Sequence, residues 1–414
     1  MHARLPLLLN RSVFRVAGTR SFSKSPLAME KSLLVSSNPG TNAVVTLNRP
    51  KALNALDLDM CRDLRALQLD WRTNPSADTT PALMIMNGSG EKAFCAGGDV
   101  KSIWEEIVSD GMTEEKLGKG LPGQRHSDFF RTEYEMNYLL GTSNVPQISF
   151  WDGFVMGGGV GISVLGKYRV ATEKTVFAMP ETAIGLFPDV GSSSWLPQLD
   201  TPSGIGLYLG LTGNRLYAHD LLETRIATHY VLSKDLEDVQ DAMMSIPCAI
   251  KDDKEEVCKR IEGILKEMKP RDKPDDSKSI VLKYADVISH CFDLSKPYED
   301  IAVSLEAEAD KGGENGAFAQ KTLDTIKKMS PASCMLTYQQ LKRGQGQSLK
   351  DCLVMEYRLA QRCMAGGDFK EGIRAVLVDK DHNPRWPADT SNMQKIETYF
   401  DSLGEYDLDL DTIA

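Results

Sequence analysis

The sequence predicts an α/β fold followed by a helical C-terminal region. Three apolar, β-branched runs each precede a helical pattern, and strands alternating with helices are typical of α/β layers. Beyond about residue 232 the strand signal fades and helical periodicity takes over. The predicted strands span residues 43–47, 82–86 and 147–151, and the helices that follow them span residues 56–71, 100–108 and 157–165. The predicted C-terminal helices span residues 254–268, 277–291, 318–329 and 349–364.

Composition and charge limit the class of protein. The chain has 414 residues, of which 42% are hydrophobic and 26% charged, as in globular proteins. Its longest apolar stretch, near residues 155–165, is interrupted by glycines and falls short of the roughly 20 residues that span a bilayer. A formal charge of −10 argues against nucleic acid as the main partner. We expect an α/β core over residues 30–232 and a helical region over residues 233–414.

Residues 1–29 have the composition of a mitochondrial transit peptide. They contain arginines and serines but no acidic residue. On a helical projection their apolar side chains gather on one face, away from the arginines, which indicates a basic amphipathic helix. The segment Arg20-Ser21-Phe22-Ser23 resembles a matrix-peptidase site, with cleavage near Ser23. We therefore expect the mitochondrial matrix; a disordered tail is the alternative.

The cysteines and histidines predict no metal site and no disulfide framework. The eight cysteines are widely spaced and never form a C-x-x-C motif. None of the six histidines has metal-ligand spacing with another. We expect reduced thiols and no metal or redox cofactor.

Two glycine-rich segments stand at strand-to-helix turns. Residues 92–99 follow the second predicted strand, and residues 153–161 follow the third. Bare backbone N–H groups at such turns favour negative charge, and two that converge would form an oxyanion hole. The alternative is that the glycines only permit tight turns. A dinucleotide fingerprint fails at Ile162, and a serine-hydrolase elbow fails at Trp195, so neither NAD binding nor a serine nucleophile is expected.

A third segment, residues 177–192, carries two carboxylates in apolar surroundings. Glu181 follows Pro180 and Asp189 follows Pro188, within a run of Phe, Met, Ala, Ile and Leu. Carboxylates that are costly to desolvate are either structural caps or groups with a catalytically tuned pKa. The residues alone leave both readings open.

Taken in order, the three segments resemble the crotonase (enoyl-CoA hydratase/isomerase) superfamily. The resemblance extends from about residue 43 to residue 386, and the string from Gly157 to Asp189 is similar to mitochondrial acyl-CoA thioester hydrolases of that superfamily. It implies a crotonase-type spiral of repeated β-β-α units, an acyl-CoA substrate and no cofactor.

The resemblance also implies roles for individual residues. The backbone N–H groups of Gly98 and Gly158 would form the oxyanion hole, and Glu181 and Asp189 would be the catalytic carboxylates. Substrate-binding residues would be Glu133, Ala96, Gly158, Glu181 and Asp189, with the Ala96 carbonyl holding the adenine amine. For Glu133 the alternative is an exposed helical residue, because Glu135 lies close enough to confuse the register.

One departure from the hydratases is informative. Hydratases of the superfamily carry a second glutamate where this chain has Gly161, and a glycine where it has Asp189. Hydration of a double bond needs two opposed acid/base groups, so the resemblance favours thioester hydrolysis. It implies hydrolysis of 3-hydroxyisobutyryl-CoA in valine breakdown, with 3-hydroxypropionyl-CoA as a second substrate. Glu181 would attack the thioester or act as a general base on water.

Two other functions stay open at this point. An enoyl-CoA hydratase or isomerase is disfavoured by Gly161, and a non-catalytic component of the mitochondrial ribosome is disfavoured by the intact glycines and carboxylates. No nucleic acid and no membrane is expected as a partner, and a homo-oligomer stays open. Gly158→Val is expected to abolish hydrolysis, and Gly153→Ala to be milder.

Overall fold

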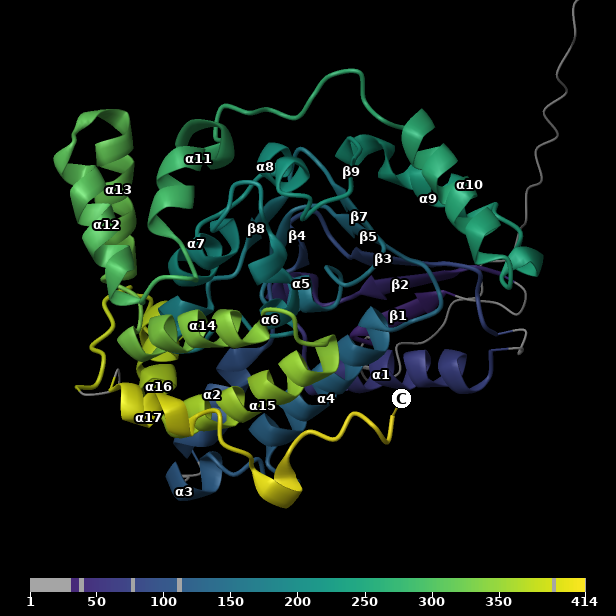
Figure 1. Ribbon diagram of the computed structural model, residues 1–414. Coiled ribbons are helices and arrows are strands. Elements are labelled where there is room, and N and C mark those ends of the chain that lie inside the picture. The colour runs from purple at the N-terminus through teal and green to yellow at the C-terminus, as the bar shows by residue number, and fades with distance from the viewer. Residues whose placement is uncertain (1–30, 37–40, 76–78, 110–113, 389–391, 414) are drawn as a thin grey trace, which may run out of the picture. The chain divides into compact units, whose positions relative to one another are not determined.

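The computed structural model describes residues 31–36, 41–75, 79–109, 114–388 and 392–413. Within it, Ser32–Ala414 forms one compact unit (Figure 1). The transit peptide predicted for residues 1–29 lies outside the described residues. All described strands end by Tyr230, and every later described element is a helix. The predicted division at residue 232 into two regions stays a prediction.

Two mainly parallel sheets form the centre of the unit. The larger sheet has the order β1-β2-β3-β5-β7-β9 and is parallel except for the β1–β2 pair, and the smaller sheet has the parallel order β4-β6-β8. The larger sheet contains β1 (Leu33–Ser36), β2 (Ala43–Leu47), β3 (Met84–Gly88), β5 (Gln147–Trp151), β7 (Tyr168–Ala171) and β9 (His229–Tyr230). The smaller contains β4 (Ala93–Cys95), β6 (Phe154–Met156) and β8 (Val176–Ala178).

The chain coils through both sheets in repeated β-β-α units. Strands β3 and β4 lead into α2 (Val100–Ser109), β5 and β6 into α5 (Gly158–Gly161), and β7 and β8 into the 3₁₀ helix η2 (Glu181–Ile184). This confirms the predicted crotonase-type spiral. Because β4, β6 and β8 are parallel neighbours, the segments that follow them emerge at the same edge of the smaller sheet.

Helices cover the sheets on separate sides. Helices α9 (Leu236–Met244) and α10 (Lys254–Glu267) pack on one face of the larger sheet (Figure 1). Helices α1 (Leu58–Thr73) and α4 (Arg125–Gly141) pack against each other within the main core. The C-terminal helices that approach the site are α14 (Pro331–Gly344), α15 (Leu349–Ala365), α16 (Gly367–Ile373) and the π-helix η6 (Arg374–Val378).

The remaining helices are mostly short or peripheral. The α-helices are α3 (Glu114–Leu117), α6 (Ser192–Trp195), α7 (Ile205–Thr212), α8 (Ala218–Glu223), α11 (Ile280–Cys291), α12 (Glu299–Asp310), α13 (Gly313–Ile326) and α17 (Met393–Thr398). The 3₁₀ helices are η1 (Pro50–Ala52), η3 (Leu196–Gln198), η4 (Ser233–Asp235), η5 (Cys248–Ile250) and η7 (Gly404–Tyr406).

Most predicted elements are present, with one clear error. Strands β2 and β5 have the predicted bounds, whereas β3 lies two residues later than predicted. The helix predicted over residues 157–165 is wrong in length, since α5 is a single turn. The helix is short because glycine has a low helix propensity. Just after α5, the Ser163 hydroxyl also donates to the Gly159 carbonyl at 2.7 Å.

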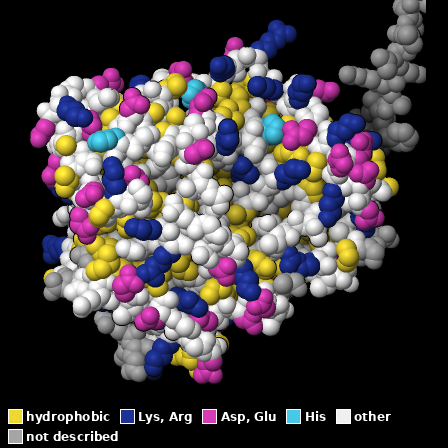
Figure 2. Space-filling view, in the orientation of Figure 1, with side chains coloured by type: hydrophobic (Ala, Val, Ile, Leu, Met, Phe, Trp, Pro, Cys, Tyr) yellow, Lys and Arg dark blue, Asp and Glu magenta, His cyan; other side chains and the backbone are white. Residues whose placement is uncertain are grey.

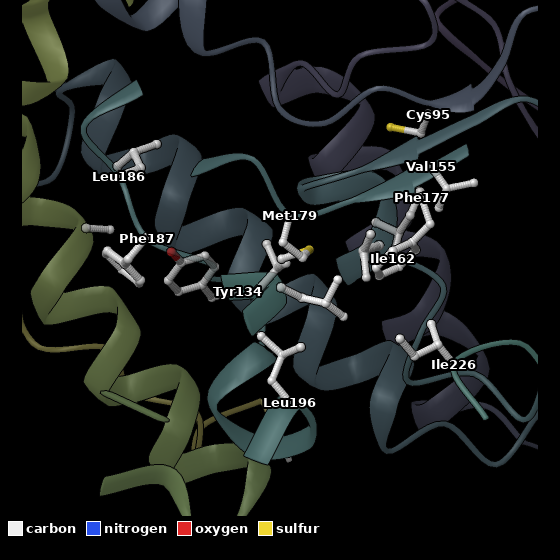
Figure 3. Packing of buried hydrophobic residues seen from close by; sticks show 14 of the residues in the cluster. Cys95, Tyr134, Val155, Ile162, Phe177, Met179, Leu186, Phe187, Leu196 and Ile226 are labelled. Carbon is white, nitrogen blue, oxygen red and sulfur yellow. The ribbon is translucent and has the colours of Figure 1, made fainter. Parts of the chain in front are cut away.

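The main hydrophobic core lies beside the carboxylate-bearing segment. In Figure 3, Tyr134, Leu186 and Phe187 lie on one side of Met179, and Val155, Ile162 and Phe177 lie on the other. All seven side chains are buried. The segment that carries Glu181 is therefore embedded in packed side chains.

The surface in view mixes charges of both signs. On the face shown in Figure 2, Lys and Arg side chains are interspersed with Asp and Glu side chains. None of the described helices is long and apolar enough to cross a membrane.

Candidate active site

A cavity of about 420 Å³ opens where the segments after β4, β6 and β8 meet. These segments contribute Gly97, Gly98, Gly157, Gly158 and Glu181 to its lining. Helix α4 adds Glu133, the turn before α6 adds Asp189, and the π-helix η6 adds Val376 and Leu377. The structure therefore brings together residues that are far apart in the sequence, including every site residue predicted above.

The N–H groups of Gly98 and Gly158 face a common space. An ideal Cβ atom placed on Gly158 would lie 3.2 Å from the Gly98 nitrogen and 2.6 Å from Glu133 Oε1. Neither N–H group has a hydrogen-bond partner among the described residues. Two free donors at one cavity wall provide the geometry that stabilises a developing oxyanion.

Gly157 permits the close approach of Glu181 to this wall. Its φ of +46° lies in the region that favours glycine, and a Cβ atom there would lie 2.8 Å from Glu181 Oε1. The glycine run is thus required both for backbone conformation and for space.

Three carboxyl groups are buried in the same cavity. Glu133, Glu181 and Asp189 are only 2%, 5% and 7% exposed. Glu133 Oε1 and Glu181 Oε2 have no hydrogen-bond partner among the described residues, whereas the Tyr134 hydroxyl donates to Asp189 Oδ2 at 2.6 Å. Unpartnered buried oxygens of this kind are expected where a ligand supplies the partner.

Burial shifts the pKa of all three carboxyl groups upwards. It raises the pKa of Glu181 well above its ordinary value, and the charge of Asp189 adds to the effect. Burial likewise raises the pKa of Glu133, with further contributions from Asp189 and Glu181. Burial raises the pKa of Asp189 to about 6, against the opposing hydrogen bond from Tyr134. Perturbed carboxyl groups in a cleft are a mark of functional sites.

The structure distinguishes Glu133 from Glu135. Glu133 faces the cavity from α4, whereas Glu135 forms an ion pair with Arg65 at 2.5 Å between Arg65 Nε and Glu135 Oε2. The reading of Glu133 as an exposed helical residue is therefore wrong.

Ala96 lies on the cavity wall. Its N–H donates to the Leu53 carbonyl at 3.0 Å, which joins it to the loop after β2. Arg49 holds that loop, since its Nη1 donates to the Ala55 carbonyl at 2.6 Å and its Nη2 to Asp99 Oδ2 at 2.8 Å.

Gly161 cannot be replaced by a larger residue without movement. A Cβ atom at this position would lie 2.4 Å from Val190 Cβ. Val190 therefore fills the space into which a side chain at position 161 would project.

The C-terminal helices hold the turn that carries Glu181. The Ser330 N–H, just before α14, donates to the Thr182 carbonyl at 3.1 Å. A Cβ atom on Gly185 would lie 2.2 Å from the Asp368 carbonyl carbon, and one on Gly372 would lie 2.4 Å from the Ile184 carbonyl carbon. Helix α16 thus packs directly on the backbone of η2.

Sequence reasoning missed several residues of the site. Tyr134 supports Asp189, Glu356 on α15 contacts the turn after Asp189, and η6 lines the cavity. Glu356 lies within the range of the resemblance, residues 43–386, but nothing in the local pattern links it to Asp189.

In the described part of the chain, no group of three or more His, Cys, Asp or Glu side chains is arranged to hold a metal ion. All eight cysteines are free thiols, and Cys258 alone among them is not fully buried.

The spiral and the cavity define a member of the crotonase fold class. The family described as Enoyl-CoA hydratase/isomerase matches residues 42–400, and the chain belongs to that family. A carnitinyl-CoA dehydratase from Mycobacterium thermoresistibile superposes with a TM-score of 0.76 at 29% identity, covering 92% of this chain and 99% of that chain. An enoyl-CoA hydratase from Rhodobacter sphaeroides 2.4.1 superposes with a TM-score of 0.73 at 29% identity, covering 92% and 100%.

Among curated proteins, the chain is similar to those named "3-hydroxyisobutyryl-CoA hydrolase, mitochondrial". The Xenopus tropicalis protein is 41% identical over 374 residues, which cover 90% of this chain and 89% of the relative. The Homo sapiens protein is 40% identical over 390 residues, covering 93% and 92%. The Gallus gallus protein is 42% identical over 377 residues, covering 90% and 89%.

Proposed function

We propose that the chain hydrolyses the thioester of 3-hydroxyisobutyryl-CoA to 3-hydroxyisobutyrate and CoA, a step of valine breakdown. The convergence of two free N–H groups and three buried carboxyl groups on one cavity carries this proposal. The names of the relatives agree with it. We propose 3-hydroxypropionyl-CoA, which lacks one methyl group, as a second substrate.

The oxyanion hole prepares the thioester for attack. The N–H groups of Gly98 and Gly158 would donate to the thioester carbonyl oxygen and stabilise the negative charge that grows on it. Preorganised donors of this kind typically contribute about 10²–10³ in turnover.

Glu181 supplies the group that starts hydrolysis. In its ionised form it attacks the thioester carbon, the carbon–sulfur bond breaks, and CoA leaves as a thiolate. Water then adds to the resulting mixed anhydride, which returns the Glu181 carboxylate and releases the acid, and the remaining proton of the water neutralises the CoA thiolate. If Glu181 is instead a general base, it takes a proton from water that attacks the thioester directly, with the same products.

These two routes are separated by product partitioning in hydroxylamine. Thioesters of CoA and of pantetheine form the same anhydride on Glu181, so the ratio of hydroxamate to acid should be identical for both. If water attacks the thioester directly, hydroxylamine and water compete while the CoA or pantetheine group is still attached. The ratio of hydroxamate to acid then differs between the two thioesters.

Asp189 and Glu133 would recognise the acyl group. Asp189 has one oxygen engaged by Tyr134 and lies at the cavity wall, where it can accept a hydrogen bond from the substrate 3-hydroxyl. Glu133 offers an unpartnered oxygen beside the oxyanion hole. We propose that the Ala96 carbonyl accepts from the adenine amine of CoA.

We propose the mitochondrial matrix as the site of action. The printed names of the relatives include the word mitochondrial, and residues 1–29 have a transit-peptide composition. We propose no metal or redox cofactor, because the steps above need none. Import into isolated mitochondria, followed by N-terminal sequencing of the matrix form, tests this assignment.

Release of free CoA tests the activity. Purified protein is incubated with 3-hydroxyisobutyryl-CoA, 3-hydroxypropionyl-CoA, isobutyryl-CoA and crotonyl-CoA, and thiol release is followed alongside loss of the crotonyl double bond. Thiol release that is fastest for the 3-hydroxyacyl substrates supports the proposal. Hydration of crotonyl-CoA without thiol release would establish a hydratase instead.

A further inference from the structure

A buried carboxyl group on α15 contacts the turn that carries Asp189. Glu356 is fully buried, and its Oε2 accepts a hydrogen bond from the Gly191 N–H at 2.6 Å. Its Oε1 accepts from the Ser193 N–H at 2.8 Å and from the Ser193 hydroxyl at 2.5 Å. These three donors offset part of the cost of burying the Glu356 carboxyl group.

The turn is strained at Val190. Its φ of +55° lies in the left-handed region, which β-branched residues rarely adopt, and Gly191 follows with a φ of +89°. The Val190 side chain is wedged against Gly161, where a Cβ atom would lie only 2.4 Å from Val190 Cβ. Such a conformation persists only where its surroundings hold it.

Asp189 is fixed on its other sides as well. Tyr134 donates to its carboxylate at 2.6 Å. The preceding carbonyl, that of Pro188, accepts from Gln340 Nε2 at 2.5 Å and from the Ser192 hydroxyl. Val190 joins Asp189 to Gly191, whose N–H donates to Glu356.

We propose that Glu356 is a positioning residue for Asp189. By binding the N–H groups of Gly191 and Ser193 it holds Val190 in the left-handed conformation, and so sets the direction in which Asp189 faces the cavity. Glu356 thereby maintains the preference for acyl groups that carry a 3-hydroxyl. This inference rests on the proposed thioester hydrolysis and names a determinant of its specificity.

The competing explanation is that Glu356 only caps α6. A cap would stabilise the fold and affect all substrates equally, whereas a positioning residue changes the preference between substrates. The ratio of kcat/KM for 3-hydroxyisobutyryl-CoA to kcat/KM for isobutyryl-CoA, which lacks the hydroxyl, distinguishes the two.

The first variant is Glu356→Gln. The amide keeps the shape of the side chain but places an NH₂ group opposite one of the backbone donors, so one of the two N–H groups loses its acceptor. We expect the kcat/KM ratio to fall about tenfold, since small misplacements of a substrate-binding group have effects of this size or larger.

Asp220→Asn is the matched control. Asp220 is also a buried carboxylate that accepts from a serine hydroxyl, that of Ser279, and from a backbone N–H, that of Ile280 at 3.1 Å. It does not line the cavity. Its replacement should lower the melting temperature but leave the kcat/KM ratio within about twofold of the original.

A double mutant tests the route through Asp189. In an Asp189→Asn background, Glu356→Gln should change the ratio by less than about twofold, because the group that it positions is already altered. An undiminished effect in that background, or equal losses on both substrates in the single variant, would overturn the proposal.

Ser193→Ala provides an independent variant if Glu356→Gln does not fold. It removes the hydroxyl that donates to Glu356 Oε1 without altering the carboxyl group, and it should lower the same ratio. An unchanged ratio in folded Ser193→Ala would also overturn the proposal. Absence of CoA release by the unmodified protein would instead refute the proposed function, so the two failures are distinguishable.

Discussion

At the scale of single residues, Glu181 is the side chain on which turnover depends most. Its carboxyl group is buried, has one unpartnered oxygen and lies beside the glycine wall. Glu181→Gln should keep the fold and lower kcat by about two orders of magnitude or more, because neither a nucleophile nor a base remains. Thiol release and a melting curve measure the two properties. Near-normal turnover by the folded variant would remove Glu181 from the mechanism.

Asp189 should discriminate for the 3-hydroxyl group. Asp189→Asn is expected to lower kcat/KM for 3-hydroxyisobutyryl-CoA about tenfold or more beyond its effect on isobutyryl-CoA, because a site that binds a hydroxyl rejects the analogue without it. Parallel assays on the two thioesters provide the measurement. Equal losses would show that Asp189 serves the hydrolytic step itself.

The same variant should shift the pH profile. The charge of Asp189 contributes to the raised pKa of Glu181, so replacing it with neutral Asn lowers the pKa of Glu181. Since hydrolysis needs the ionised carboxylate, the acid limb of kcat/KM should move to lower pH. Isobutyryl-CoA is the suitable substrate because it does not use the hydroxyl contact. An acid limb that stays in place would contradict the electrostatic coupling.

The oxyanion hole can be tested through Gly158. A methyl group there would approach Glu133 Oε1 to 2.6 Å, so Gly158→Ala should lower turnover about 10²–10³-fold. Gly166→Ala is the control. Its added Cβ atom would lie 3.0 Å from Gln147 Cδ, and Gly166 does not line the cavity. If both variants lose activity only in proportion to their folded fraction, the assignment of the hole is wrong.

Gly153 does not serve as this control, contrary to the prediction from sequence. Its φ is +88°, and a Cβ atom there would lie 2.2 Å from the Lys92 carbonyl oxygen. Gly153→Ala should therefore disturb the backbone between β4 and β6 and not be mild.

At the scale of elements, the sequence predicts helices and strands that have a regular hydrophobic period, but it does not predict where the backbone packs closely. The long amphipathic pattern of α15 and the apolar run of β5 predict these elements well. Strands β4, β6 and β8 have only three residues each, too few for an alternating pattern to stand out. Asp57 accepts from the Met60 N–H at 2.8 Å and caps α1, which begins two residues later than predicted.

The candidate site was predictable where it depends on local sequence. The glycine turns and the two carboxylates after proline lie in short continuous segments, which made the resemblance visible. Contacts such as that from Tyr134 to Asp189 join residues 55 positions apart, and those from Glu356 join residues more than 160 apart. Only the folded chain reveals such contacts, because no local pattern specifies them.

The contact between α16 and η2 gives a prediction for an element interface. A methyl group on Gly372 would press on the Ile184 backbone at 2.4 Å, so Gly372→Ala should displace η2 and with it Glu181. We expect kcat to fall at least about tenfold. Gly263→Ala on α10 is the control, since nothing lies within 4 Å of its added methyl. Unchanged kcat in Gly372→Ala would show that η2 does not depend on α16.

At the scale of the whole molecule, the buried carboxyl groups should make stability depend on pH. Burial raises the pKa of Asp189 to about 6 and that of Glu356 to about 8, so the folded state binds protons more tightly than the unfolded state between about pH 4 and pH 8. The free energy of unfolding should therefore fall as pH rises through this window.

Melting temperatures at about pH 5.5 and pH 8 provide the measurement, with a decrease of several degrees expected. Glu356→Gln removes one of the titrating groups and should make the decrease smaller. A melting temperature that rises across this range would contradict the assignment of raised pKa values to these groups.

The contacts that the α14 and α16 regions make with η2 determine when activity can appear during synthesis. The turns of the spiral leave the ribosome first, yet the contacts that hold Glu181 come from Ser330, Asp368 and Gly372. Domains of this size fold through partly ordered species, and long-range contacts form late. A nascent chain that stops before residue 330 would already contain Gly98, Gly158 and Glu181 but could not hold the last of them in place. Premature termination before residue 330 should thus yield protein that still contains the strands of both sheets but has no hydrolase activity.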